Sequence, residues 1–224
     1  PLIRSYNYPP LAHAGISIKY DIPQIYHPVS RKPLKPHYLL DRNIAILKIF
    51  PGISPQVVES ILNIPGLKGV VMETFGSGNA PGYDWLLEML KDAVERGIVI
   101  VNVTQCLAGS VEMHRYETGR KLLQAGVVSG YDSTTECAVA KLMFLFGHGM
   151  TPDEVKEHLN CSLIGEITIV ETIVPSACKH RFIGMENSFV LMKRCFRAFN
   201  TPLLPPYRRY PMPSSYRNVG SERR

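Results

Sequence analysis

The sequence predicts an α/β fold in which a small parallel sheet lies between two layers of helices. Three short aliphatic runs occupy residues 44–50, 69–74 and 98–103, and the stretches after them have the apolar spacing of helices. Strands that alternate with helices favour a parallel sheet covered on both faces. A chain of 224 residues is long enough to bury one such core, so we expect one complete domain with irregular ends.

The first half of this domain has clear signals for the start of each helix. After the first strand, Ser54 and Pro55 occupy the capping position and the first position of a helix that extends to about residue 63. The second strand, at 69–74, precedes an amphipathic helix at about 83–96. The apolar stripe of that helix contains Trp85, Leu86, Met89, Leu90 and Ala93.

The second half continues the alternation. The third strand, at 98–103, is almost wholly aliphatic. We predict a helix near 116–125, a short strand at 126–130 and two final helices. The first of these covers about 133–146, with Asp132 or Ser133 as its cap and Glu136 in its first turn, and the second covers about 152–159 after Thr151. This plan is typical of a small three-layer domain, flavodoxin-like or Rossmann-like.

The two ends of the chain lack this regularity. Residues 1–43 are rich in Pro and Tyr, and only the alternation at 15–20 resembles a strand. Residues 167–174 have the composition of a strand, but 175–224 combine proline and clustered arginine without a sustained period. We therefore predict a divergent, disordered tail over 167–224.

The positive charge of the chain belongs to this tail. The net charge is +6, but residues 179–224 contain ten basic and two acidic side chains, a net of +8. The other residues contain 15 basic and 17 acidic side chains, a net of −2. Clustered Arg and Tyr residues are able to bind RNA, but no recognised binding module contains them. A solvated tail is the favoured interpretation, and we do not expect nucleic acid as a partner.

The composition also argues against a membrane-spanning protein and against a metal-binding protein. No run of about 18 apolar residues would span a bilayer, and no signal-peptide pattern stands at the start, so we expect a soluble, cytoplasmic protein. The five cysteines include no Cys-x-x-Cys pair, and no two histidines lie three or four apart on a predicted helix. We expect no metal site.

A glycine-rich turn follows the second strand, at residues 75–81. Gly76 and Gly78 permit close approach of a ligand, and Asn79 offers two donors and an acceptor beyond the carboxyl end of a strand. One interpretation is therefore a site for a small polar ligand. The alternative is a tight connection in which the glycines serve only the backbone and Asn79 caps the next helix.

Five motifs in order identify a family. They are Ser5-x-Asn7-Tyr8-Pro9-Pro10-Leu11, Phe50-Pro51-Gly52-Ile53, the stretch from Glu73 to Pro81, the stretch from Arg96 to Cys106, and Gly126-Val127-Val128-Ser129-Gly130. Together they resemble the C-terminal lobe of the cytosolic, bacterial type I-like L-asparaginases, which include the animal asparaginase/lysophospholipase proteins. The resemblance covers about residue 5 to Glu166. Ile164 departs from it, because members usually have arginine directly before the closing Gly-Glu.

The resemblance implies a two-lobed amidohydrolase that converts L-asparagine to L-aspartate and ammonia through a threonine acyl-enzyme, without metal or organic cofactor. In the family the nucleophile lies on the larger N-terminal lobe, whose Thr-Gly-Gly-Thr and Thr-Asp-Thr motifs are absent here. Residues 1–20 resemble the last hairpin of that lobe, 21–43 the connector, and 44–166 the smaller lobe. We therefore expect these 224 residues alone to be inactive.

Family members form an intimate dimer in which the smaller lobe completes the active site of the neighbouring subunit. By this resemblance Asn79 contacts the α-amino and carboxylate groups of the substrate. Tyr116 resembles a position that completes the site in cytosolic members. An equally weighted interpretation is a half-buried tyrosine on a helix that has no role in the site.

Some bacterial members also bind asparagine at an effector site on this lobe. Thr104 and Cys106 match two of its positions, but Glu73 stands where those enzymes have arginine. A carboxylate does not pair with a ligand carboxylate as arginine does, so we do not expect the effector site. We expect Cys106 to be a small buried apolar residue and not a nucleophile.

The main alternative is a module without catalysis. The same fold would bind an amino acid, or would pair with a complete partner subunit. Binding of RNA by the basic tail is a third possibility, which predicts a steep dependence of affinity on salt.

Overall fold

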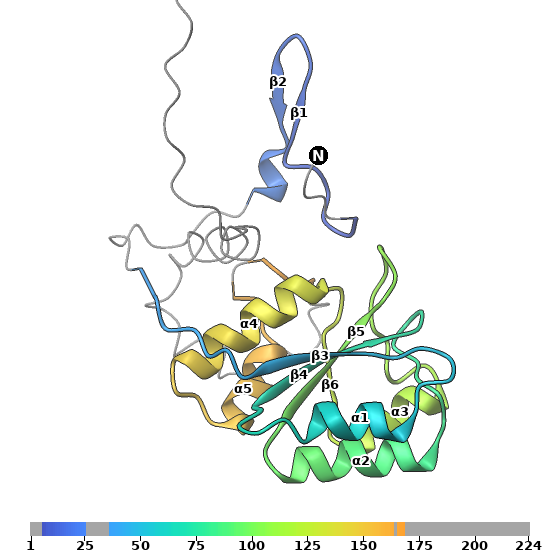
Figure 1. Cartoon of the computed structure of the whole chain (residues 1–224). Coiled ribbons are helices and arrows are strands. Elements are labelled where there is room, and N and C mark those ends of the chain that lie inside the picture. The colour runs from blue at the N-terminus through green and yellow to red at the C-terminus, as the bar shows by residue number, and fades with distance from the viewer. Residues whose placement is uncertain (1–5, 26–35, 164, 169–224) are drawn as a thin grey trace, which may run out of the picture.

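The structure is a computed structural model that describes residues 6–25, 36–163 and 165–168. Its centre is a sheet of four parallel strands in the spatial order β3-β4-β5-β6. The sheet lies between two groups of helices (Figure 1). The strands are β3 (Ile44–Lys48), β4 (Gly69–Thr74), β5 (Val99–Thr104) and β6 (Val128–Ser129).

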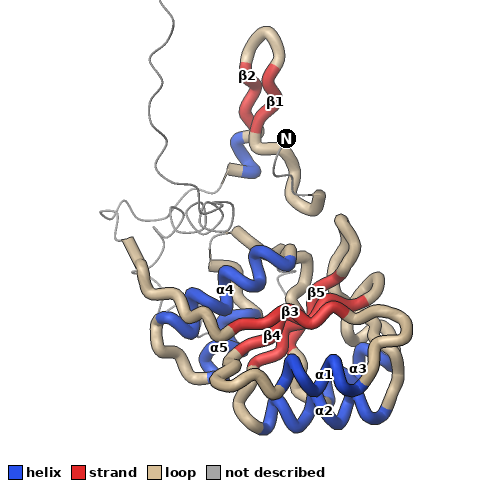
Figure 2. The backbone as a smooth tube through the Cα atoms, in the orientation of Figure 1, coloured by secondary structure: helices blue, strands red, loops and turns tan. Residues whose placement is uncertain are grey.

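Helices cover both faces of the sheet, as Figure 2 shows with strands in red and helices in blue. The first group is α1 (Pro55–Leu62), α2 (Asp84–Glu95) and α3 (Glu117–Gln124), and the second is α4 (Thr135–Gly147) and α5 (Pro152–Leu159). Alternate residues of a strand face opposite sides, so Val70 and Met72 pack in the first core and Val71 in the second. The predicted three-layer α/β fold is confirmed.

The strands follow one another across the sheet in chain order. The order therefore runs in one direction, without the reversal that flavodoxin-like and Rossmann-like sheets contain at their ligand crevice. A site at the carboxyl edge of this sheet must consequently be built from the loops after β4 and β5 and from the helix ends beside them.

The helix starts agree with the sequence in two cases and differ in one. Thr151 caps α5 in a capping box with Glu154, as predicted, and Pro55 is the first residue of α1, although the side chain of Ser54 makes no capping hydrogen bond. The cap of α4 is Thr134 and not Asp132 or Ser133. The reason is that the Ser133 N–H still closes the preceding turn, at 3.0 Å from the Gly130 carbonyl.

A β-hairpin stands outside the three layers at the N-terminal end (Figure 1). Its antiparallel strands are β1 (Ala12–Ala14) and β2 (Ile18–Tyr20), and the short 3-10 helix η1 (Ile22–Gln24) follows. The alternation at 15–20 thus yields a strand only from Ile18. Asn7 ties this segment to the domain, because its Nδ2 donates to the carbonyls of Gly109 and Asp132 at 2.9 and 3.0 Å. Assignment of the hairpin to a second lobe stays a prediction.

Residues 36–43 enter the sheet along α4. The Asp41 N–H donates to the Met143 carbonyl at 2.9 Å, and a Cβ at Gly147 would overlap the backbone of Leu39. The Asp41 carboxylate pairs with Lys68 at 2.6 Å, and this hydrogen bond, followed by one from the Asn43 backbone, holds the pKa of Asp41 below its ordinary value. The entry to β3 is therefore fixed to the helix layer.

At the other end, a buried ion pair fixes the segment after α5. Lys141 Nζ lies 2.8 Å from Glu166 Oε1, with side chains 5% and 4% exposed. The Leu163 N–H donates to the same carboxylate. Apart from 167 and 168, the predicted tail and its possible strand lie outside the described residues.

Candidate functional site

The turn after β4 closes tightly on itself. Phe75 and Asn79 exchange two backbone hydrogen bonds, of 2.8 and 2.9 Å, and the Gly78 N–H donates to the Phe75 carbonyl at 3.1 Å. Gly76 and Gly78 have φ of 50° and 100°. A Cβ at Gly78 would lie 2.6 Å from Val111 Cγ1, so both the backbone conformation and the space require glycine there.

Three residues from two neighbouring segments, β5 and the loop after it, brace the carbonyl groups of this turn. The Thr104 hydroxyl donates to the carbonyl of Gly76. The Glu112 N–H donates to the carbonyl of Ser77 at 2.9 Å, and Asn102 Nδ2 donates to that of Gly78 at 3.0 Å. With the Phe75–Asn79 pair, these bonds engage every carbonyl from 75 to 79. The turn is therefore held as a rigid platform at the carboxyl edge of the sheet.

The side chain of Asn79 lies at the edge of this platform, half-buried. Its Oδ1 accepts a hydrogen bond from the Thr118 hydroxyl at 2.8 Å. Its Nδ2 donates to no other residue in the described part of the chain. The alternative in which Asn79 caps the next helix is wrong, because α2 begins at Asp84 with Tyr83 in the capping position. The four residues between Asn79 and α2 keep the amide away from that helix end.

Two wholly buried polar side chains support the platform from inside the sheet. Thr74 and Asn102 are each 0% exposed, and the Thr74 hydroxyl donates to Asn102 Oδ1 at 2.6 Å. The sequence pattern gave no reason to single them out, since β5 reads as an aliphatic strand. The available signal was the amide itself, because an asparagine between valines of a central strand requires buried partners.

Tyr116 lies at the same corner of the molecule. It is the residue before α3, and its neighbour Thr118 contacts Asn79. Its side chain is exposed, and the Arg115 guanidinium lies 5.7 Å from its ring centroid. Tyr116 is therefore at a helix start and not within a helix, and its substrate role stays a prediction.

Thr104 and Cys106 lie at and beyond the end of β5. The Thr104 hydroxyl accepts from the Cys106 N–H at 3.0 Å while it donates to Gly76. The expectation that Cys106 is a buried apolar residue is wrong, because its side chain is exposed. The strand ends at Thr104, and the chain has already left the sheet when it reaches Cys106.

Glu73 makes contacts with α4 and with β3. Its carboxylate accepts from the Thr135 hydroxyl at 2.6 Å and pairs with Lys48 at 3.0 Å. This pair of contacts satisfies the negative charge at the position where the resemblance would require a cation. Absence of the effector site stays a prediction.

The described residues include no metal-binding cluster, and their buried free thiol is unreactive. Among them, no group of three or more His, Cys, Asp or Glu side chains is placed to hold a metal ion. Burial raises the pKa of the Cys137 thiol to about 12, with nearby Glu166 as a further cause, so this thiol remains protonated at neutral pH. No helix in the described part of the chain has the length and apolar character needed to cross a membrane.

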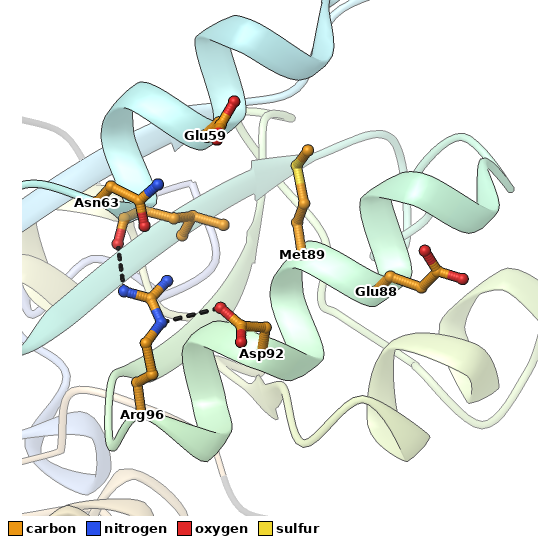
Figure 3. Close-up of a pocket in the computed structure, with 7 residues that line it drawn as sticks. Glu59, Asn63, Glu88, Met89, Asp92 and Arg96 are labelled. Carbon is orange, nitrogen blue, oxygen red and sulfur yellow. Dashed lines mark hydrogen bonds and ion pairs between the residues drawn. The ribbon is translucent and has the colours of Figure 1, made fainter.

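A hollow of about 270 Å³ lies between α1 and α2, as Figure 3 shows. Arg96 crosses it, and its guanidinium donates to Asp92 Oδ2 at 2.9 Å and to the Leu62 carbonyl at 3.3 Å. Because α1 ends here before β4 begins, the hollow lies at the amino end of the sheet. We assign no ligand to it, since its one cation is already paired and the glycine turn lies at the opposite edge.

Comparisons with known proteins place this architecture among characterised families. The model of the glutaminase/asparaginase C-terminal domain matches residues 43–159. The 60 kDa lysophospholipase of Mus musculus is 40% identical over 169 residues, which cover 75% of this chain and 30% of that protein. L-asparaginase 1 of Escherichia coli strain K12 is 38% identical over 163 residues, which cover 72% of this chain and 47% of that protein.

A solved structure agrees with these sequence matches. L-asparaginase I from Vibrio cholerae O1 superposes with a TM-score of 0.66 and 40% identity, over 74% of this chain and 50% of that one. The chain thus spans from 30% to 50% of the length of the three relatives.

Proposed function

The chain belongs to the glutaminase/asparaginase C-terminal domain family, and from this premise we propose that it forms the smaller lobe of an amidohydrolase that converts L-asparagine to L-aspartate and ammonia. The sequence resemblance is confirmed by the family match. The observation that supports the activity best is the rigid turn at the carboxyl edge of the sheet, which presents the Asn79 amide with its oxygen held and its nitrogen available.

Asn79 has the chemistry to recognise the two groups that all α-amino acids share. Its Nδ2 is able to donate to the α-carboxylate of asparagine. Its Oδ1 accepts from Thr118 at 2.8 Å and has a second lone pair, which suits the α-ammonium group. Tyr116, at the same corner, would close the site beside it. These contacts orient the substrate and leave its side-chain amide to the catalytic groups.

The chemical step belongs to a second lobe in this proposal. A threonine hydroxyl there would attack the side-chain carbonyl carbon, the C–N bond would break with proton transfer to the leaving ammonia, and water would then hydrolyse the ester. The 224 residues contain neither Thr-Gly-Gly-Thr nor Thr-Asp-Thr. Residues 44–166 would therefore act as a binding lobe, joined through the connector at 21–43 to the lobe of which 1–20 form the last hairpin.

The site would be completed across a dimer. The glycine turn lies at an open edge of the sheet, so its Asn79 is able to reach into the active site of a neighbouring subunit. No metal or organic cofactor is required by this mechanism. The competing function is a non-catalytic module, which would bind a free amino acid or would associate with a complete partner subunit.

Calorimetry with L-asparagine separates these functions. We expect no heat with the 224-residue chain alone, and heat of binding and hydrolysis once the larger lobe of a family asparaginase is added, because only then are both halves of the site present. L-aspartate serves as the product control. Saturable binding of asparagine by the chain alone would instead support the binding module.

A further inference from the structure

We propose that Thr118 and Asn102 are positioning residues that set the direction of the Asn79 side chain, a role whose catalytic meaning rests on the proposed substrate contact of Asn79. The two residues act from different sides. Thr118 donates a hydrogen bond to the side-chain amide of Asn79. Asn102 donates one to the backbone carbonyl of Gly78, which is the residue before Asn79.

Asn102 connects the platform to the interior of the sheet. It is 0% exposed, and a wholly buried amide is stable only when its donors and acceptor are paired. Its Oδ1 accepts from the Thr74 hydroxyl at 2.6 Å, and its Nδ2 donates to the Gly78 carbonyl at 3.0 Å. The peptide unit that leads into Asn79 is therefore bound directly to β4 and β5, the two central strands.

Thr118 fixes the remaining freedom of the side chain. A fixed backbone alone does not define where the amide points, because χ1 has three staggered wells and the terminal torsion χ2 of asparagine is broad. A hydrogen bond to Oδ1 restrains both torsions. The Thr118 hydroxyl holds Oδ1 at 2.8 Å, and its Cγ2 lies 4.0 Å from the position of a Cβ at Gly82. With the oxygen held from α3, the nitrogen must point away from that helix.

The hydrogen bond of Thr118 differs from those made by threonines that cap a helix. The Thr134 and Thr151 hydroxyls accept from N–H groups of the helices that they cap. The Thr118 hydroxyl instead donates to a side chain 39 positions away, whose nitrogen the described residues leave unbound. We infer that this hydrogen bond, and not packing alone, sets the direction of the Asn79 amide.

The first test measures the orientation of Asn79 in the 224-residue chain itself. Three-bond NMR couplings across χ1 of Asn79 should report one rotamer in the unmodified protein. Thr118→Val removes the hydroxyl at nearly constant shape, and we expect averaged couplings. Thr118→Ser keeps the hydroxyl and should restore the single rotamer. Unchanged couplings in Thr118→Val would overturn the inference.

Two further variants make this test specific. Thr151→Val is the same substitution at the cap of α5, on the other face of the sheet, and should lower Tm without a change in the Asn79 couplings. Asn102→Asp keeps an acceptor for Thr74 and removes the donor to Gly78, so it should also average the couplings. That variant provides an independent test if Thr118→Val does not fold.

Kinetics then separate this inference from the proposed function. In the two-lobed enzyme, Thr118→Val should lower kcat/KM about fivefold, mainly by raising KM, and should have no further effect when Asn79 is already alanine. If Asn79→Ala lowers activity but Thr118→Val changes neither couplings nor kinetics, the positioning role is wrong and the proposed function stands. If the couplings respond but Asn79→Ala leaves activity unchanged, the proposed function is wrong and the orientation by Thr118 stands.

Discussion

Asn79→Ala in the two-lobed enzyme is expected to lower kcat/KM by the equivalent of ~1–3 kcal/mol, because one polar contact to the substrate is lost in a desolvated site. The amide is held by Thr118 at 2.8 Å on a turn whose carbonyls are all engaged, so its direction is set before the substrate binds. Steady-state kinetics with L-asparagine measure the effect. The loss should appear in both kcat and KM if the contact strengthens as the substrate reacts.

The matched control for this variant is Asn63→Ala. Asn63 is an exposed asparagine at the end of α1, at the amino edge of the sheet and away from the glycine turn. Its replacement should leave kcat/KM unchanged. Equal kinetics for Asn79→Ala and the unmodified enzyme would exclude Asn79 from the site.

Lys141→Met is expected to lower the free energy of unfolding by ~3–5 kcal/mol, since it removes one partner of a buried ion pair. Lys141 and Glu166 are 2.8 Å apart, and both side chains are almost wholly buried. The lysine also donates to the Cys161 carbonyl, so the substitution removes a buried hydrogen bond as well. Urea unfolding of the 224-residue chain at neutral pH measures the change.

An exposed ion pair provides the control. Lys121 and Glu117 are 3.4 Å apart on α3, with side chains 41% and 76% exposed. Lys121→Met removes the same charge at a solvated position and should change stability by at most about 0.5 kcal/mol. If the two variants have similar stabilities, the pair between Lys141 and Glu166 does not anchor the segment after α5.

Periodicity was sufficient for the elements of the sheet domain. The strand predicted at 69–74 has those same bounds in the structure, because Val70, Val71 and Met72 form an aliphatic run that packs against both helix layers. The helix at 152–159 was equally clear, since Thr151, Pro152 and Glu154 give three independent start signals. Local chemistry alone determines such elements.

The sequence was less informative about features that tertiary contacts determine, namely the cap of α4 and the exposure of Cys106. Ser133 looks like a better cap than Thr134 because Glu136 follows it at capping-box spacing, but the turn at 130–133 uses the Ser133 N–H first. Cys106 was expected inside because no His and Asp stand at a recognisable spacing to activate its thiol, but its exposure depends on how the loop leaves the sheet.

The candidate site divides in the same way. Asn79 was visible in the sequence because glycines surround it and a strand precedes it. Thr118 was not, because it is 39 positions away and only the packing of α3 against the turn brings the two side chains together. Asn102 was hidden by its valine neighbours. Residues that contact a ligand are often found by motif, whereas those that hold them depend on the fold.

Release of ammonia from L-asparagine is the most direct test of the claim that this chain supplies the binding lobe and not the catalytic one. The purified 224-residue chain should release none above the spontaneous rate, and the same residues joined to the larger lobe of a family asparaginase should release it without added metal or cofactor. Ammonia release at enzymatic rates by the chain alone would contradict the account, as would an inactive two-lobed protein whose fold is intact.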